Sequence, residues 1–369
     1  MKKIIFIFLF ILLSLIIALI SGEVLLRLAW SGKPRNVSYR EITVKDKMVG
    51  YRFVPNSSKT VVGIMNNYKT IVKINSHGFR GRNYTYDKES NIKRILLFGD
   101  SETFGQGVDE QDMLNVVMEK QLNTGDYMTY EVINLSMPGT GTLAQEQIFI
   151  HDGLKYSPDI VIFFLTSNDL IDNVNYVTTR KKQKAGPRRR SSYIKSTHLY
   201  AFVKWQLRPY FLRSPLLRKI LLIFYNPSTT EDLPGIIEQW YTEKWINDGL
   251  PLMKDSFERI NSLSKKNNIE LIIAVTPNHP QFNKNYEELL KIIVSRSYAD
   301  KFMEDPQKPQ RIIKEFCKSR SIHYIELLDD FRNLSQNSDI LLKHVHDGHL
   351  NKRGTLEIAR ILIRELRGL

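Results

Sequence analysis

The sequence predicts an α/β fold with a five-stranded, mostly parallel sheet covered by helices on both faces. After residue 90, five short apolar runs alternate with longer stretches of helical periodicity. The apolar runs are 94–98, 131–135, 159–165, 270–275 and 322–327, and the helical stretches are 111–123, 142–155, 250–266, 308–319 and 351–367. Strands that are apolar throughout are typical of a sheet buried on both faces. Regular strand–helix alternation favours parallel order.

The N-terminal segment predicts a membrane anchor. Two lysines precede an apolar run over residues 4–20, and the apolar pattern resumes beyond Gly22. About 20 such residues cross a bilayer as a helix, and flanking lysines mark the cytoplasmic side. We therefore expect residues 1–30 to be a single-pass anchor with the body of the protein outside the cytoplasm, periplasmic or extracellular. The alternatives are a cleaved signal peptide, whose cleavage site Ile20 fits poorly, and a buried core helix.

The next segment, residues 31–90, predicts a β-rich lead-in to the main domain. The runs 60–65 and 68–74 are β-rich and flank Asn66-Asn67, which indicates a hairpin. Residues 75–78 have the composition of a turn. Nothing in this segment indicates catalysis, so we expect it to pack against the domain formed by residues 91–369.

The positive charge is concentrated in one part of the chain. The formal net charge is +14, and residues 180–219 contain 13 Lys or Arg without any Asp or Glu. This stretch belongs to an insert at 177–247, predicted as a mobile basic loop at 180–192 and a basic, aromatic, partly helical part at 198–225. A lid, a lipid-facing helix, an acidic-glycan contact and a solvated loop with packed helices all suit it. No recognised motif supports binding to nucleic acid.

Four polar blocks lie at strand ends or before the last helix, where ligands gather in parallel sheets. Ser101 follows the first strand in a glycine-containing turn, a suitable place for a nucleophile. Gly139 offers an unobstructed N–H group and Asn168 an amide to a developing oxyanion. His349 is a candidate base and Asp347 a candidate carboxylate that orients it. Taken alone, the first three blocks are better explained as a polar turn with a capping serine, a helix-capping turn and an Asx turn.

Together, the four blocks resemble those of the SGNH (GDSL-like) hydrolase family, over roughly residues 93–367. The resemblance implies a flavodoxin-like three-layer α/β/α sandwich. It also implies that Ser101 attacks an ester carbonyl, and that the Ser101 and Gly139 N–H groups and the Asn168 amide bind the oxyanion. No metal or organic cofactor is expected.

The chain departs from the family pattern in three places. Glu102 replaces the leucine of the Gly-Asp-Ser-Leu signature, and Thr166 stands where glycine is common. The usual last block is Asp-x-x-His, but the residue three before His349 is His346, and Asp347 lies two before. This spacing resembles that of periplasmic polysaccharide O-acetyltransferases of the alginate type. The histidine cluster alternatively suggests a metal site, although no further histidine-rich stretch would complete it.

These observations predict a membrane-anchored serine esterase that removes acyl groups, with acetyl favoured, from a cell-surface glycan or lipid. One alternative is an O-acyltransferase that adds acetyl groups to an exported polysaccharide, supplied by a membrane-bound acyl donor partner. Another is an inactive SGNH fold that binds glycans or assists assembly. The intact Ser, Gly, Asn, Asp and His set argues against this alternative.

The single cysteine, Cys317, excludes an intramolecular disulfide and a four-cysteine zinc site.

Overall fold

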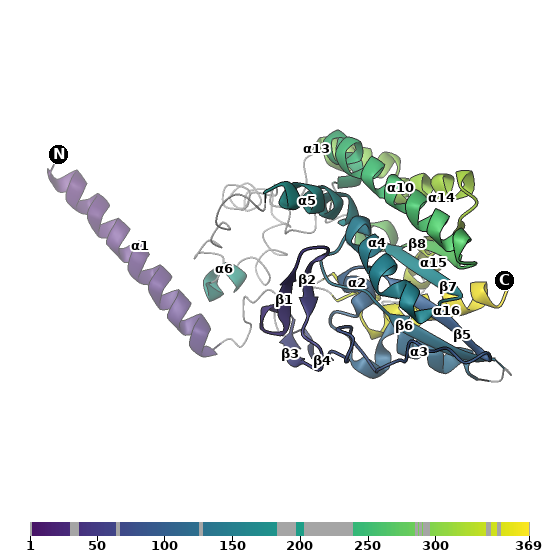
Figure 1. Cartoon of the computed structure of the whole chain (residues 1–369). Helices are drawn as coiled ribbons and strands as arrows, with labels where there is room; N and C mark the ends of the chain where they lie inside the picture. Colours follow the sequence, from purple (N-terminus) through teal and green to yellow (C-terminus); the bar gives the residue numbers. More distant parts are fainter. Residues whose placement is uncertain are drawn as a thin grey trace. The chain divides into compact units, whose positions relative to one another are not determined.

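The computed structural model describes residues 2–29, 37–63, 67–124, 128–182, 197–202, 239–284, 287, 290, 296–336, 341–344 and 348–368 (Figure 1). The chain divides into two compact units. One unit contains helix α1 (Lys2–Ala29) and the short helix α6 (His198–Phe202). The first unit also includes residues 62–69, and the other contains the rest of the lead-in strands and the α/β domain.

The α/β domain is built on one five-stranded parallel sheet with the order β6-β5-β7-β8-β9. The strands are β5 (Ile92–Phe98), β6 (Thr129–Asn134), β7 (Ile160–Leu165), β8 (Glu270–Val275) and β9 (His323–Ile325). In chain order this is 2-1-3-4-5, the order of flavodoxin-like sheets, so the predicted fold class is confirmed. The order reverses between β5 and β7, and ligands bind outside the carboxyl ends of strands at such a point.

Helices cover both faces of this sheet, as the apolar strands predict. One face packs against α3 (Leu114–Leu122), α15 (Leu328–Gln336) and α16 (Lys352–Leu366) in a common apolar core. The opposite face packs through phenylalanines against α4 (Thr142–His151), α10 (Glu243–Lys266) and α14 (Lys308–Ser319). In the sheet, Phe98 of β5 stacks on Phe163 of β7 with ring centroids 4.6 Å apart.

The remaining helices are short or flank the insert. They are α2 (Ser101–Phe104), α5 (Asp169–Lys182), α11 (His279–Phe282) and α13 (Arg296–Glu304), with 3₁₀ turns η1 (Arg40–Ile42), η3 (Glu110–Asp112), η4 (Gly153–Tyr156) and η7 (Gln239–Tyr241). Helix α10 begins at residue 243 and runs through Pro251, whereas the sequence predicts a start at 250. Proline removes one helical hydrogen bond, so packing must sustain the helix. Gly249 approaches α5 so closely that a Cβ there would lie 2.6 Å from the Leu170 carbonyl oxygen.

The lead-in forms two small sheets. The predicted hairpin is observed as β3 (Ser58–Val62) paired with β4 (Lys69–Lys73), and its tip at 64–66 lies outside the described residues. The sequence did not predict the antiparallel pair β1 (Thr43–Asp46) and β2 (Gly50–Phe53). The turn at 75–78 is confirmed by a 3.1 Å hydrogen bond from the Gly78 N–H to the Asn75 carbonyl oxygen.

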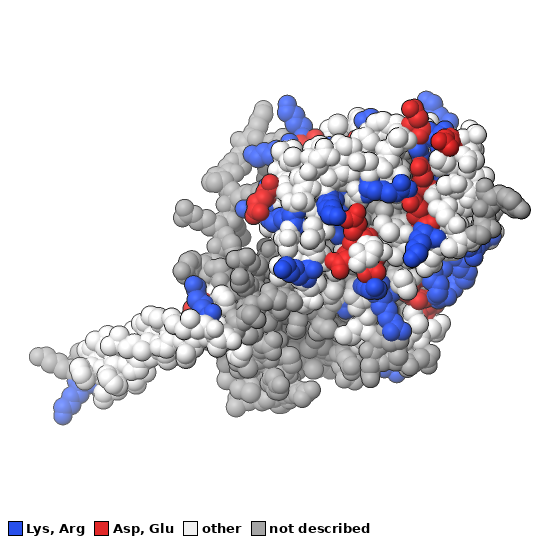
Figure 2. Space-filling model, turned by 90° about the horizontal axis from the view of Figure 1, so that it is seen from below, with Lys and Arg blue, Asp and Glu red and all other residues white. Residues whose placement is uncertain are grey.

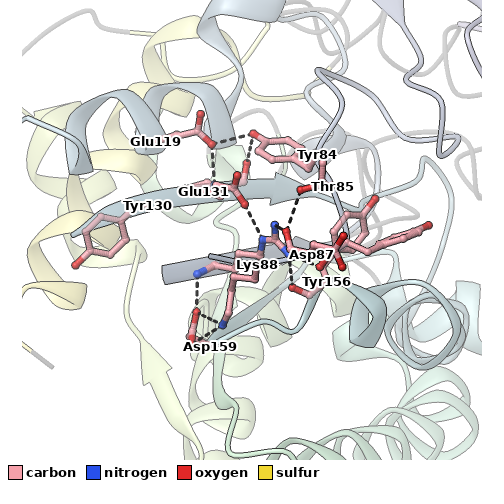
Figure 3. A network of polar contacts seen from close by, with 12 residues as sticks. Tyr84, Thr85, Asp87, Lys88, Glu119, Tyr130, Glu131, Tyr156 and Asp159 are labelled. Atoms are coloured by element: carbon pink, nitrogen blue, oxygen red, sulfur yellow. Dashed lines mark hydrogen bonds and ion pairs between the residues drawn. The ribbon is translucent and has the colours of Figure 1, made fainter. Parts of the chain in front are cut away.

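Arg94 ties the end of the lead-in to the amino-terminal edge of the sheet. Figure 3 labels three residues that it contacts, Asp87, Glu131 and Tyr156. Its side chain is fully buried, and its Nε donates to the Glu131 carboxylate at 2.6 Å. The guanidinium also donates to the carbonyl oxygens of Tyr86, Asp87 and Tyr156, each at 2.8 Å. One charged side chain thereby joins β5, β6, the turn before β7 and the chain that leads into the sheet.

In the other unit, α1 is one continuous helix of 28 residues. Residues Ile5–Ala29 are long and apolar enough to cross a membrane, and their large apolar side chains are exposed. Figure 2 shows the helix as uncharged along most of its length. A buried core helix does not fit this exposure, whereas a membrane span and a signal sequence both do. Of the predicted insert, α5 includes 180–182 and α6 includes 198–202; residues 183–196 and 203–238 lie outside the described residues.

Candidate active site

Ser101 lies in a tight turn at the carboxyl end of β5. Gly99 and Asp100 separate the strand from α2, which begins at Ser101, and the Asp100 carboxylate accepts from the Glu102 N–H at 2.9 Å. The helix ends after four residues at Gly105, whose φ of 81° is left-handed. This turn leaves the Ser101 side chain partly exposed. Within the described residues, its own N–H group has no hydrogen-bond acceptor.

His349 lies beside Ser101, although 248 residues separate them in the chain. The His349 Nε2 atom is 2.7 Å from the Ser101 Oγ atom. The ring is carried by a hairpin in which Lys343 pairs with Leu350 and the His344 N–H donates to the His349 carbonyl oxygen at 2.8 Å. Ser101 and His349 therefore have the separation that proton transfer between them requires.

Helix α16 begins directly after this hairpin and fixes its position. The Asn351 side chain caps the helix by accepting from the N–H groups of Arg353 and Gly354 at 2.9 and 3.0 Å. A Cβ on Gly354 would lie 2.1 Å from the Leu342 carbonyl oxygen, so only glycine allows the helix this close to the hairpin.

The other ring nitrogen of His349 faces Gln106. The Gln106 Nε2 atom lies 3.3 Å from His349 Nδ1, and the Tyr39 hydroxyl lies 3.3 Å from Gln106 Oε1. If Nε2 is to accept a proton from Ser101, then Nδ1 must carry a hydrogen. The Gln106 amide accepts that hydrogen when its carbonyl oxygen is turned toward the ring, and the Tyr39 hydroxyl then accepts from the amide N–H. Asp347, the predicted orienting carboxylate, lies outside the described residues.

Gly139 lies beyond the carboxyl end of β6 in a loop held by the lead-in. Its φ of 69° is left-handed, a conformation that favours glycine. The preceding residue, Pro138, accepts a 2.6 Å hydrogen bond from the Tyr51 hydroxyl. Gly139 is exposed, and among the described residues its N–H group has no acceptor. The lead-in thus supports the second predicted block of the site.

Asn168 follows β7 and is held by neighbours on both sides of its amide. Its Oδ1 atom accepts from the Thr166 hydroxyl at 2.7 Å, and its Nδ2 atom donates to Asp172 Oδ2 at 2.6 Å. An amide nitrogen carries two hydrogens, so one N–H remains for a ligand. All the predicted site residues that the structure describes thus follow β5, β6 or β7 or precede α16.

One known protein family matches most of this chain. The sequence profile of the GDSL-like lipase/acylhydrolase family matches residues 95–362, more than half of the chain. The chain belongs to this family. The predicted resemblance to SGNH and GDSL-like hydrolases is therefore confirmed. No curated protein matches the chain.

Several solved structures are similar to this GDSL-like chain at low identity. An acetyl xylan esterase, AlAXEase, is 15% identical with a TM-score of 0.40, and the match covers 74% of this chain and 99% of that one. TesA is 11% identical with a TM-score of 0.40, covering 75% and 99%. A catalytic mutant of Axe2, an acetylxylan esterase from Geobacillus stearothermophilus, is 11% identical with a TM-score of 0.41, covering 76% and 96%.

Three carboxyl groups lie near the GDSL-like site: Asp100 and Asp169 are buried, and Asp172 is partly buried. Burial, followed by the charge of Glu102, raises the pKa of Asp100, and burial with Asp100 nearby raises that of Asp169 well above its usual range. Burial also raises the pKa of Asp172 to about 7, against the hydrogen bond from Asn168. No arginine or lysine pairs with these three carboxyls within the described residues.

A hydrogen count at Thr166 supports a proton on one of these carboxyl groups. The Thr166 hydroxyl lies 2.9 Å from Asp100 Oδ2, 2.7 Å from Asn168 Oδ1 and 3.2 Å from Asp169 Oδ2. One hydroxyl hydrogen can serve only one of three acceptors. A protonated carboxyl at Asp100 or Asp169 satisfies a second contact, in agreement with the raised pKa values.

Sequence reasoning missed several residues around the site. Gln106 lies inside the first block, but a glutamine in a turn carries no signal for contact with a distant histidine. Glu102 was noted only as a departure from the signature, yet its Oε1 atom lies 2.5 Å from Lys343 Nζ. The alternative of a metal site at the histidine cluster needs at least three ligands close together. Among the described residues, no three His, Cys, Asp or Glu side chains are grouped in this way, and residues 345–347 of the cluster lie outside the described residues.

Proposed function

We propose that this GDSL-like hydrolase is a membrane-anchored serine esterase that cleaves acyl esters, with acetyl favoured, on a cell-surface glycan or lipid. The observation that carries the proposal is the 2.7 Å separation of Ser101 Oγ and His349 Nε2 at the carboxyl edge of a parallel sheet. In a member of an acylhydrolase family, an imidazole at this distance is positioned to activate the serine.

The proposed reaction has two acyl-transfer steps. His349 Nε2 takes the proton of Ser101 as Oγ attacks the ester carbonyl carbon. The protonated ring then gives this proton to the departing alcohol, which leaves an acyl-serine. In the second step His349 takes a proton from water, the hydroxyl attacks the acyl-serine, and the ring returns the proton to Ser101 Oγ. Asp347 holds Nδ1–H toward itself and stabilises the charged ring.

The oxyanion of each tetrahedral intermediate needs donors that are already in place. Two backbone N–H groups, of Ser101 and Gly139, lack acceptors among the described residues, and Asn168 has one amide hydrogen left. We assign these three groups to the oxyanion. Losing one such donor typically lowers kcat by a factor of about 10²–10³.

The anchor supports a substrate at the cell surface. Helix α1 has the length and apolar surface of a membrane span, and two lysines precede its apolar part. With the lysines on the cytoplasmic side, the catalytic domain lies outside the cytoplasm. An ester-bearing glycan or lipid at the membrane surface is then the substrate within reach.

The proposal is tested with the full-length chain in detergent. The protein is incubated with p-nitrophenyl acetate and with a serine-directed phosphonate, followed by peptide mass analysis. We expect ester cleavage, with phosphonate attached at Ser101 and no label in Ser101→Ala. A folded wild-type protein that neither cleaves the ester nor reacts at Ser101 would favour the alternative of an inactive fold that binds glycans or assists assembly.

The same acyl-serine serves a transferase if a sugar hydroxyl replaces water. Product analysis with an acetyl donor and a glycan acceptor separates the two outcomes. Free acetate as the main product supports the esterase, whereas an acetylated glycan would assign the chain to O-acyl transfer.

A further inference from the structure

The residue after the proposed nucleophile contacts both sides of the hairpin that carries the proposed base. We propose that Glu102 is a positioning residue that fixes His349 relative to Ser101, an inference that rests on the proposed function. Glu102 occupies the signature position at which the sequence departs from leucine. Neither the family match nor the proposed reaction gives this carboxylate a role.

Each oxygen of the Glu102 carboxylate binds a different side of the hairpin. Oε1 accepts from the Lys343 ammonium at 2.5 Å, and Oε2 accepts from the Leu350 N–H at 2.8 Å. Lys343 and Leu350 are paired across the hairpin, and Leu350 directly follows His349. Glu102 directly follows Ser101, and its partner Leu350 directly follows His349. One side chain thus joins the nucleophile turn to the hairpin next to both proposed catalytic groups.

The contact is buried, which makes it sensitive to the loss of either partner. The Lys343 side chain is 2% exposed and that of Glu102 is 11% exposed. Burial, followed by the Lys343 charge, lowers the pKa of His279 to about 3, so His279 carries no charge at neutral pH. A buried ammonium with its carboxylate removed is costly, whereas a buried ion pair replaced by apolar groups often is not.

This clamp has a direct consequence for catalysis. The Ser101–His349 distance depends on two segments that are far apart in the chain, the α2 turn and the 343–350 hairpin. A displacement of about 1 Å between catalytic groups can lower a rate about a hundredfold. The clamp therefore acts on kcat, and it leaves the binding of a small ester unchanged.

Three variants of the full-length chain separate the two arms of the clamp. Glu102→Gln keeps an oxygen for the Leu350 N–H but turns a donor toward Lys343. The double variant Glu102→Gln/Lys343→Met also keeps that oxygen and leaves no unpaired charge. Glu102→Leu/Lys343→Met leaves no unpaired charge either, but it has no acceptor for Leu350. Each is assayed for kcat and KM with p-nitrophenyl acetate and for its melting temperature.

We expect Glu102→Gln to lower kcat by about tenfold or more with KM unchanged, from the cost of misplaced catalytic groups. Glu102→Gln/Lys343→Met should recover most of that loss. Glu102→Leu/Lys343→Met should stay about tenfold or more below the other double variant. If Glu102→Gln does not fold, the two double variants still decide the question.

The matched control breaks another buried ion pair far from the site. Glu131→Gln removes the carboxylate that pairs with Arg94, whose side chain is fully buried, at the opposite edge of the sheet. It should lower the melting temperature and leave kcat unchanged. This control separates a loss of stability from a loss of positioning.

Three results would overturn the role of Glu102. The first is a wild-type kcat in Glu102→Gln, and the second is an equal kcat in the two double variants. The third is a kcat in the control Glu131→Gln that falls along with its melting temperature, because a loss of stability alone would then explain a lower kcat. In each case wild-type protein remains active and labelled at Ser101. A wild-type protein that is inactive and unlabelled contradicts the proposed function instead.

Discussion

At the scale of single residues, the proposed reaction depends on which ring nitrogen of His349 carries a hydrogen. Two groups compete to accept from Nδ1: Gln106, which the structure places 3.3 Å away, and Asp347, which the sequence predicts. Both orient the ring, but only a carboxylate stabilises the charged imidazolium. The two side chains therefore have unequal predicted effects.

Replacing these two acceptors tests their roles. We expect Asp347→Asn to lower kcat by a factor of about 10³–10⁴, because the amide neither stabilises the charged ring nor selects the productive tautomer. Gln106→Leu should lower kcat by only about tenfold, the loss of one neutral hydrogen bond. Steady-state kinetics with p-nitrophenyl acetate measures both. The reverse order of effects would make Gln106 the principal partner of His349.

The buried carboxyl groups predict a dependence of stability on pH. Asp172 has a pKa of about 7 in the folded chain, raised by burial, and about 3.9 when unfolded. The folded state therefore binds a proton that the unfolded state releases between these values. The stabilisation is complete below about pH 4 and is lost as the pH rises toward 7.

Asp172→Asn removes this contribution. We expect the melting temperature of the wild type to fall between pH 4 and 7 and that of Asp172→Asn to fall less steeply. Asp330→Asn is the control, since hydrogen bonding to Arg364 lowers the pKa of Asp330 and places its effect at more acidic pH. Parallel melting curves for wild type and Asp172→Asn from pH 4 to 7 would contradict the assignment.

At the scale of elements, the local sequence pattern predicts the helices and strands whose apolar residues recur with the period of that element. The helix predicted at 308–319 and the strand at 270–275 have those bounds in the structure. The sequence analysis missed α5 and the β1–β2 hairpin. Helix α5 begins inside a block that sequence reasoning assigned to a turn, and it is held by packing on α10. Non-local contacts override local preference at such places.

Replacing Arg94 tests whether the amino-terminal edge of the sheet affects stability without affecting the active site. Arg94→Met leaves the Glu131 carboxylate and three carbonyl oxygens without this donor. We expect the free energy of unfolding to fall by about 3–5 kcal/mol, as for other broken buried ion pairs. Urea titration followed by tryptophan fluorescence measures this loss. Activity per folded molecule should not change, and a large fall in kcat would contradict that independence.

At the scale of the whole molecule, the proposed topology places the catalytic domain outside the cytoplasm. The chain offers a clean test because its single cysteine, Cys317, is buried and its thiol pKa is raised to about 12 by burial. That thiol is almost entirely protonated and therefore unreactive at neutral pH. A cysteine introduced at an exposed position then reports its own side of the membrane.

Lys314, exposed on α14, is a suitable position for this reporter. We expect Lys314→Cys to react with a membrane-impermeant maleimide in intact spheroplasts, while the wild type stays unlabelled. Labelling only after the membrane is permeabilised would place the domain in the cytoplasm. The length of the labelled chain, compared with the full-length protein, separates a retained anchor from a cleaved signal peptide.

The sequence by itself determined the α/β class, the apolar N-terminal helix and the order of four polar blocks. These depend on side-chain periodicity and on residue types within short windows. Only the tertiary structure decided that Ser101 and His349 lie 2.7 Å apart, that Gln106 faces the ring, and that Glu102 joins the two segments. Such contacts arise from strand order and helix packing across some 240 residues. The four-block pattern predicts that Ser101 and His349 meet, but no local pattern indicates that Gln106 and Glu102 contact residues so far away in the chain.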